Sequence, residues 1–168
     1  MDEVARRAGV ALKTVYLAVP SKLQLLGEVI GVALAGDDLA QPIRASSWFE
    51  ESLVAPPHQL LELFAANTAH LMARAARVLQ MAEAAADSNP SIRRRRDEAQ
   101  RARRAEIRLV AEALASEAPG IEVEKAADIM YALAAPQTYV QLVDECGWTP
   151  AQYVAWLTET LGAILLKS

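Results

Sequence analysis

Residues that typically start and end helices divide this chain into segments rich in alanine and leucine. Proline is favoured at the first position of a helix, and glycine is favoured just after the last. Such residues recur at Gly9, Pro20-Ser21, Pro56-Pro57, Asn89-Pro90, Pro119-Gly120 and between Gly147 and Pro150. Hydrophobic residues make up 53% of the chain but aromatic residues only 5%, a balance that favours helices over strands. The sequence therefore predicts an all-α fold.

The same residues predict where each helix begins and ends. We expect helices over residues 2–8, 12–18, 21–35, 58–86, 90–117, 123–145 and from 150 onward, with a loop over 36–55 that includes a turn of helix near 48–53. The helix over 123–145 is expected to be interrupted or kinked at Pro136, because proline lacks the amide hydrogen that a helix interior needs. Two helix starts have the spacing of a capping box, namely Ser21 with Gln24 and Thr149 with Gln152.

The charge balance limits what the whole molecule can bind. The 168 residues carry a net charge of −4 at pH 7, so any contact with DNA must be local.

The single cysteine, Cys146, cannot form an intrachain disulfide, which fits a reducing compartment. The apolar stretches are too short to span a bilayer, and the acidic start Met1-Asp2-Glu3 is unlike a signal peptide. We expect a cytoplasmic protein with no membrane partner.

No residue pattern points to catalysis, to a metal or to a cofactor. Two histidines and one cysteine lack the spacing of metal ligands, and no glycine-rich phosphate-binding loop is present. The acid pairs Asp37-Asp38 and Asp144-Glu145 are explained by solvated loops and helix ends. No nucleophile can be assigned together with its base. We therefore expect a protein that is not an enzyme.

The first 22 residues have the pattern of a helix-turn-helix. Small apolar residues before and after Gly9 allow two short helices to pack closely, and Gly9 supplies the turn. Thr14 and Tyr16 place hydroxyls on the second helix, and Lys22 stands at the start of the third. Hydroxyls and lysines at such positions commonly contact DNA phosphates.

The run from Ala8 to Lys22, followed by Leu25-Leu26, resembles the TetR family of bacterial transcriptional regulators. That family has an Ala-Gly-Val turn, a Thr-x-Tyr recognition helix, and then an aromatic residue, Pro, Ser and Lys. The C-terminal run that starts at Gly147-Trp148-Thr149-Pro150 resembles the last helix of the family. Two positions depart from the pattern, because Val19 replaces the usual Phe and Ala11 replaces a usual Ser cap.

The resemblance implies a ligand-responsive repressor that binds a palindromic operator as a dimer. Residues 1–35 would be a DNA-binding helix-turn-helix with its connecting helix, and 36–168 a ligand-binding and dimerising body. The implied DNA contacts are Arg7, Leu12, Lys13, Thr14, Tyr16, Leu17 and Lys22. Effector binding in the body would change the spacing of the two DNA-reading heads and release the operator.

The family has one further helix before this motif, and Met1 here stands inside the second family helix. A miscalled start, a shortened chain or a natural variant without DNA binding would each explain this. We expect four apolar side chains to lose their cover, namely Val4, Ala5, Val15 and Val19. The 168-residue chain is therefore expected to bind operator DNA weakly unless the missing helix is supplied.

The long central segment carries a few polar residues that could recognise a ligand. Asn67, His70 and Arg74 are spaced i, i+3 and i+7, so they share one face of the helix predicted over 58–86. They could be the polar groups of an apolar cavity for a small apolar effector, or a partly exposed polar stripe. The predicted cavity is bordered by Phe64, Asn67, His70, Leu71, Arg74 and Tyr131.

The last two helices carry more apolar residues than a monomer should expose. The residues concerned are Tyr139, Val140, Val143, Val154, Leu157, Leu161 and Leu165. They predict a two-fold homodimer through a four-helix interface.

Arginines dominate the helix predicted over 90–117. They stand at 93–96, 101, 103, 104 and 108, interspersed with Asp97, Glu98 and Glu106. A solvated helix face explains them better than a second nucleic-acid patch.

Two other functions remain open for the whole chain. One is a helical dimer that binds a small molecule but not DNA, and the other is a small all-α enzyme.

Overall fold

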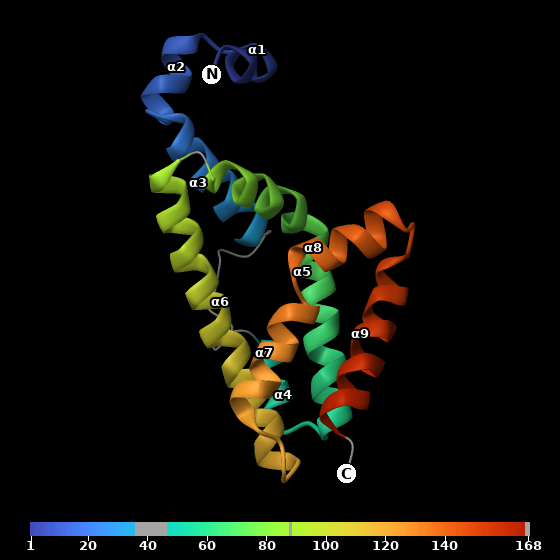
Figure 1. Ribbon diagram of the computed structural model, residues 1–168. Coiled ribbons are helices and arrows are strands. Elements are labelled where there is room, and N and C mark those ends of the chain that lie inside the picture. The colour runs from blue at the N-terminus through green and yellow to red at the C-terminus, as the bar shows by residue number, and fades with distance from the viewer. Residues whose placement is uncertain (36–46, 88, 167–168) are drawn as a thin grey trace.

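A computed structural model of the chain describes residues 1–35, 47–87 and 89–166, and every regular element in these ranges is a helix (Figure 1). The helices are α1 (Asp2–Ala8), α2 (Leu12–Ala18), α3 (Lys22–Ala35), α4 (Ser47–Ser52), α5 (Pro57–Ala86), α6 (Pro90–Glu117), α7 (Val123–Leu133), α8 (Pro136–Tyr139), the π-helix η2 (Val140–Glu145) and α9 (Pro150–Leu165). The predicted all-α fold is confirmed.

Helix α5 is the centre of the fold, packing against α3, α6, α8 and α9. Its 30 residues include Ala65, Ala75 and Ala76, which are almost completely buried and let neighbouring helices approach closely. Larger side chains fill the core around them, including Leu60, Leu61, Phe64, Val110, Leu114, Met130, Tyr153, Leu157 and Leu161. This single core lies in the part of the molecule that Figure 1 shows below α1 and α2.

The helix starts follow the capping residues that the sequence predicts. At α6 the side chain of Asn89 accepts hydrogen bonds from the backbone amides of Ser91 and Ile92, at 2.9 and 3.3 Å, and Pro90 is the first helical residue. At α9 the Thr149 hydroxyl accepts from the Gln152 amide at 3.2 Å, and the Gln152 side chain accepts from the Thr149 amide at 2.8 Å. This reciprocal pair is the predicted capping box.

The helix predicted over 123–145 is interrupted before Pro136, which is one of the two outcomes expected there. Helix α7 ends at Leu133, and Ala135 is extended, with ψ at 147°, directly before Pro136. A residue before proline is disfavoured in the helical region, so the break falls one step earlier than the proline itself. The chain then forms α8 and the π-helix η2, where the Cys146 amide bonds to the Gln141 carbonyl at 2.9 Å. No residue pattern indicates this wider turn.

Part of the loop predicted over 36–55 lies outside the described residues, which resume at Ser47. The turn of helix predicted near 48–53 is α4, which buries Phe49 and Ser52. The Ser52 hydroxyl donates to the Phe49 carbonyl at 2.7 Å, so this buried polar group is satisfied.

Candidate functional site

Helices α1 and α2 form a small head at one end of the molecule, joined to the rest through α3 (Figure 1). Gly9 ends α1 with a φ of +66°, a left-handed conformation that glycine adopts without strain. The Val10 amide then bonds to the Ala5 carbonyl at 3.1 Å and fixes the turn. Ala5 and Val15 are the buried side chains of the two helices, 5% and 8% exposed. The chain therefore forms a helix, a glycine turn and a second helix.

The structure places all seven predicted DNA-binding residues on the surface of this head. Those of α2 are exposed, with Tyr16 at 46% and Leu17 at 76%, and Lys22 is exposed at the first position of α3. Arg7 is exposed too, and its Nε donates to Glu3 at 2.8 Å. An ion pair this exposed contributes little energy, so Arg7 can exchange Glu3 for another anion.

The expectation that four apolar side chains of the head lose their cover is wrong for two of them. Ala5 and Val15 are buried, because the two short helices pack against each other at these positions. Val4 is 38% exposed, and Val19 is partly buried. Further apolar side chains of the head are exposed, namely Val10, Leu12, Tyr16 and Leu17.

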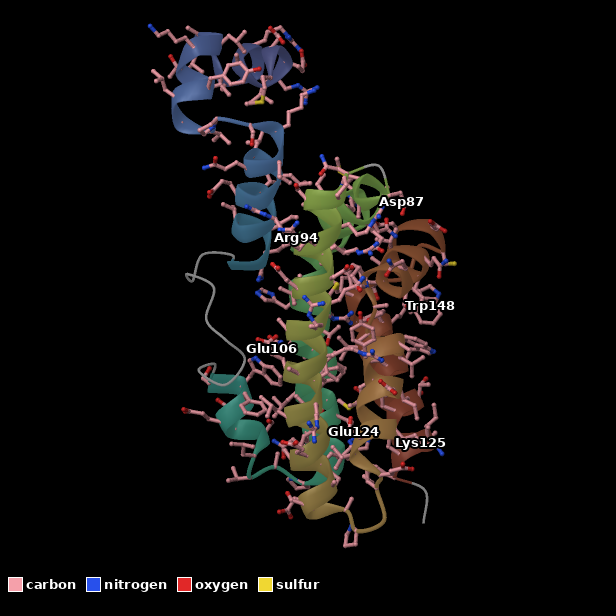
Figure 2. All side chains as sticks on the ribbon, turned by 60° about the vertical axis from the view of Figure 1, so that its left-hand side comes forward. Asp87, Arg94, Glu106, Glu124, Lys125 and Trp148 are labelled. Atoms are coloured by element: carbon pink, nitrogen blue, oxygen red, sulfur yellow. The ribbon has the colours of Figure 1, made fainter. Side chains whose placement is uncertain are left out.

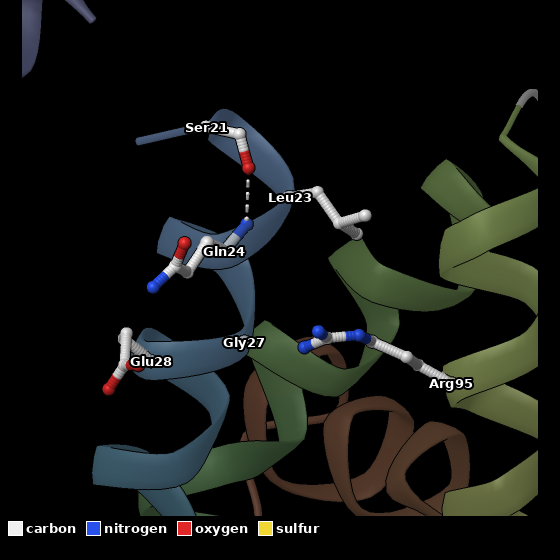
Figure 3. Close-up of a pocket in the computed structure, with 6 residues that line it drawn as sticks. All are labelled: Ser21, Leu23, Gln24, Gly27, Glu28 and Arg95. Carbon is white, nitrogen blue, oxygen red and sulfur yellow. Dashed lines mark hydrogen bonds between the residues drawn. The ribbon is translucent and has the colours of Figure 1, made fainter. Parts of the chain in front are cut away.

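A pocket of about 380 Å³ lies where the connecting helix α3 meets α6 (Figure 3). It is lined by Ser21, Leu23, Gln24, Gly27, Glu28 and Arg95. The Ser21 hydroxyl accepts from the Gln24 amide at 3.1 Å, and Arg95 extends from α6 toward Gly27. A Cβ atom on Gly27 would lie 2.7 Å from Nη1 of Arg95, so the missing side chain leaves room for the guanidinium. Arg95 of α6 thus approaches α3 at this point, whereas α3 packs mainly against α5.

Two pockets lie among the described residues, and neither is lined by any of the six predicted ligand-binding residues. Phe64 is buried in the core, whereas His70 and Arg74 are exposed, and the Arg74 Nε donates to the Ala33 carbonyl at 3.5 Å. Asn67 and Leu71 are partly buried. Tyr131 lies under the arginines of α6. A second pocket, of about 340 Å³, is lined by Gln80, Glu83, Ala84, Asp87 and Gln137, so it contains none of the six.

The seven residues of the predicted dimer interface were expected to be exposed in a monomer. This premise is wrong, because most of them lie in the core of a single chain. Leu157 and Leu161 are 0% exposed, and Tyr139 and Val140 are buried as well. The other three, Val143, Val154 and Leu165, are partly buried against that core. An apolar helical stripe shows that a face is covered, but it does not show whether the same chain or a second copy covers it.

Three of the eight arginines of α6, whose side chains are drawn in Figure 2, form ion pairs at partly or fully exposed positions. Arg96 lies 2.7 Å from Asp97 and 3.1 Å from Glu83. Arg104 lies 2.7 Å from Asp128, and Arg108 lies 2.9 Å from Glu124.

Arg103 differs from these arginines, and sequence reasoning missed it. Its Nη2 donates to the backbone carbonyls of Ala134 and Tyr131 at 2.7 and 3.3 Å, and its guanidinium lies 4.6 Å from the centre of the Tyr131 ring. The neighbouring rings of Tyr139 and Tyr153 meet edge to face at 4.9 Å. The sequence shows several arginines on this helix, but it does not show which of them is partly buried.

The described residues contain no cluster of three or more His, Cys, Asp or Glu that could hold a metal ion. In the same ranges no single helix is long and apolar enough to cross a membrane, although the pair Leu12–Ala18 and Lys22–Ala33, bent by 68°, passes on length and composition. No family model, curated protein or solved structure matches the chain.

Proposed function

We propose that this protein is a ligand-responsive transcriptional regulator, a repressor that binds a palindromic DNA operator as a dimer. One observation carries the proposal. Two short helices pack against each other around a glycine turn, Ala5 and Val15 are their buried side chains, and the remaining side chains of α2 face solvent. A short exposed helix held against a second one is the arrangement that places side chains in a major groove.

In this proposal α2 is the recognition helix. Lys13 and Thr14 in its first turn are exposed and would reach base edges, while Tyr16 and Lys22 would contact phosphates. The cations of the head stand on a protein of net charge −4, so the attraction to DNA is local. Binding would therefore weaken steeply as salt is added.

A palindromic operator follows from two heads related by a two-fold axis, with half-sites about 34 Å apart. Because Leu157 and Leu161 are used inside the chain, the second copy would cover the outer face of α9, where Ile164 is 49% exposed. Effector binding in the body would act on the heads through the contact between Arg95 on α6 and Gly27 on α3.

Removing a phosphate contact is expected to weaken DNA binding without changing the preferred sequence. The chain is used to select duplexes from a random library at low salt, and the enriched duplex is then titrated by fluorescence anisotropy. Tyr16→Ala and Lys22→Ala should each weaken binding about fivefold, and Lys22→Ala should lower the slope of log K against log salt by about 1. Lys125→Ala removes the same charge from α7 and should change neither quantity.

Two results would contradict this proposal. Failure of both the 168-residue chain and a form extended upstream of Met1 to enrich a palindromic sequence would remove the operator, and an equal loss in the Lys125→Ala control would remove the role of the head. The same selection with a form extended upstream of Met1 tests the expectation that the 168-residue chain binds weakly.

A second candidate function is a helical dimer that binds a small molecule but not DNA. Exposed apolar side chains on the head, with Leu17 at 76% and Val10 at 42%, favour it, because apolar surface of this kind suits a protein neighbour better than phosphates. It becomes the better proposal if the selection enriches no sequence.

A further inference from the structure

Two opposite charges line the pocket between α3 and α6. Arg95 reaches the pocket from α6, and Glu28 belongs to α3. In the described part of the chain neither side chain makes a hydrogen bond or an ion pair. Arg96 and Arg104 on the same helix each lie within 3.1 Å of an aspartate or glutamate oxygen. The pocket therefore holds a cation and an anion whose charged groups are both available to a ligand.

The missing side chain of Gly27 keeps the middle of the pocket open. A Cβ atom there would lie 2.7 Å from Nη1 of Arg95, too close for the guanidinium to keep its position. Only Nη1 and Cζ of Arg95 come within 4 Å of that point, so Nε and Nη2 lie farther from Gly27. Nε and Nη2 form one edge of the planar group, and neither donates a hydrogen bond to a described residue. A complete edge is thus free for a ligand with two oxygens.

Ser21 and Gln24 add neutral hydrogen-bonding groups to the same pocket. The Ser21 oxygen accepts from the Gln24 amide at 3.1 Å, and its own proton is not donated to any described group, so it is available as well. In Figure 3 Arg95 approaches Gly27 from one side, and the side chains of Gln24 and Glu28 project on the other. A ligand lying over Gly27 would meet the cation at one end and the carboxylate at the other.

We propose that this pocket binds a small zwitterion, a molecule with one carboxylate and one ammonium group, such as an amino acid. The carboxylate would accept two hydrogen bonds from Arg95, and the ammonium group would donate to Glu28. A simple anion would be repelled by Glu28, and a simple cation would be repelled by Arg95. The pocket volume of about 380 Å³ is at the lower end of the range for ligand sites, which suits a small molecule.

A ligand in this pocket would join two helices that otherwise share little surface. Helix α3 packs mainly against α5, and it follows α1 and α2 directly in the chain. A zwitterion held by Glu28 on α3 and by Arg95 on α6 would attach α3 to the body at a second place. Its role as effector rests on the proposed function, whereas the binding site does not. Such an effector would be polar, unlike the apolar one expected from the sequence.

Solvation by water alone is the competing explanation for Arg95 and Glu28, because charged side chains are common on protein surfaces. That explanation gives Gly27 no part, so substitution of this glycine separates the two. Gly27→Ala should displace the guanidinium and weaken zwitterion binding. Gly31→Ala on the same helix is the matched control, because a Cβ atom there meets nothing within 4 Å and the gain in helix propensity is the same.

The test is a titration of the ¹⁵N-labelled chain with glycine, 4-aminobutanoate and 6-aminohexanoate, followed by NMR through the arginine Nε–H signals. The Arg95 signal, assigned from Arg95→Lys, should shift and saturate with at least one of the three. Arg95→Gln and Glu28→Gln should each weaken binding of that zwitterion about tenfold or more, and Gly27→Ala severalfold. Gly31→Ala and Arg101→Gln, which removes an exposed arginine of α6 without a described partner, should stay within about twofold. Circular dichroism of each variant verifies the fold.

The matched probes are the acid without the amine and the amine without the acid, such as butanoate and butylamine for 4-aminobutanoate. Each should bind at least about tenfold more weakly than the zwitterion. The site would be overturned by the absence of a saturable shift with all three zwitterions, by equal binding of either matched probe, or by an equal loss in Arg101→Gln or Gly31→Ala.

The outcome for the pocket is separable from the outcome for the proposed regulator. Zwitterion binding that depends on Arg95, together with a failed operator selection, would overturn the regulator and leave the site in place. A selected operator without zwitterion binding would overturn the site and leave the regulator.

Discussion

Leu161→Glu is expected to unfold the individual chain rather than to separate two folded copies. Leu161 is 0% exposed in the core, packed among the side chains that join α9 to the rest of the body. A carboxylate there has no partner and loses its hydration, and the apolar contacts of leucine are lost with it. We expect the free energy of unfolding to fall by about 4 kcal/mol or more, a large share of what a domain possesses. Urea denaturation followed by circular dichroism measures it.

The matched control is Ile164→Glu, on the same helix. Ile164 is 49% exposed, so a glutamate at this position remains hydrated and the fold should survive. If the outer face of α9 joins two copies, light scattering should show that Ile164→Glu converts a dimer into a folded monomer. Folded Leu161→Glu monomers of unchanged stability would contradict the burial of Leu161 in a single chain.

Ala111→Leu is expected to destabilise the body by overfilling its core. Ala111 on α6 is 0% exposed and belongs to the same cluster as Val110 and Leu114. A leucine adds three carbon atoms where packed side chains leave no room, so neighbours must adopt strained rotamers or the helices must separate. We expect a loss of about 1 to 3 kcal/mol in the free energy of unfolding, measured by urea denaturation.

Ala105→Leu tests whether this loss comes from packing. It makes the same substitution on the same helix, but Ala105 is exposed, so the stability should change by less than about 0.5 kcal/mol. Equal effects at both positions would mean that helix propensity, not core volume, determines the result. In that case the close packing of α6 in the body would be disproved.

The helix ends were predictable because the residues that cause them are adjacent in the chain. Asn89, Thr149 and Gly9 each satisfy or redirect backbone groups within three or four residues, so their effect is visible without tertiary structure. The start of α6 at Pro90 and of α9 at Pro150 follow from this. The π-helix after Tyr139 had no such local cause.

What covers each helix could not be read from the sequence. Leu157 and Leu161 form an apolar stripe that fits a dimer interface as well as a core, and only the packing of α5 against α9 distinguishes them. Asn67, His70 and Arg74 share a face of α5, but the backbone group that Arg74 contacts, the Ala33 carbonyl, belongs to α3 and is distant in sequence. For the same reason the unusual environment of Arg103 could not be predicted.

The candidate DNA-binding residues were more predictable than the ligand-binding ones. Residues that read DNA must face solvent, and a short helix with one buried position, Val15, leaves most of its other side chains exposed. A ligand site needs side chains from several helices at once, so an error in packing displaces it. This is why the seven candidate DNA-binding residues are all at the surface, whereas the six of the body range from the buried Phe64 to the exposed His70 and Arg74.

Because the contact between α1 and α2 is small, backbone amides of the head should exchange with solvent faster than those of the body. The amides of these two helices are protected by little more than Ala5 and Val15, whereas those of α5 lie against three long neighbours. Deuterium should therefore enter the head through frequent local openings and enter α5 only when the whole body opens. Amide exchange would therefore have a fast phase from the head and a slow phase from α5. A bound duplex would slow only the fast phase.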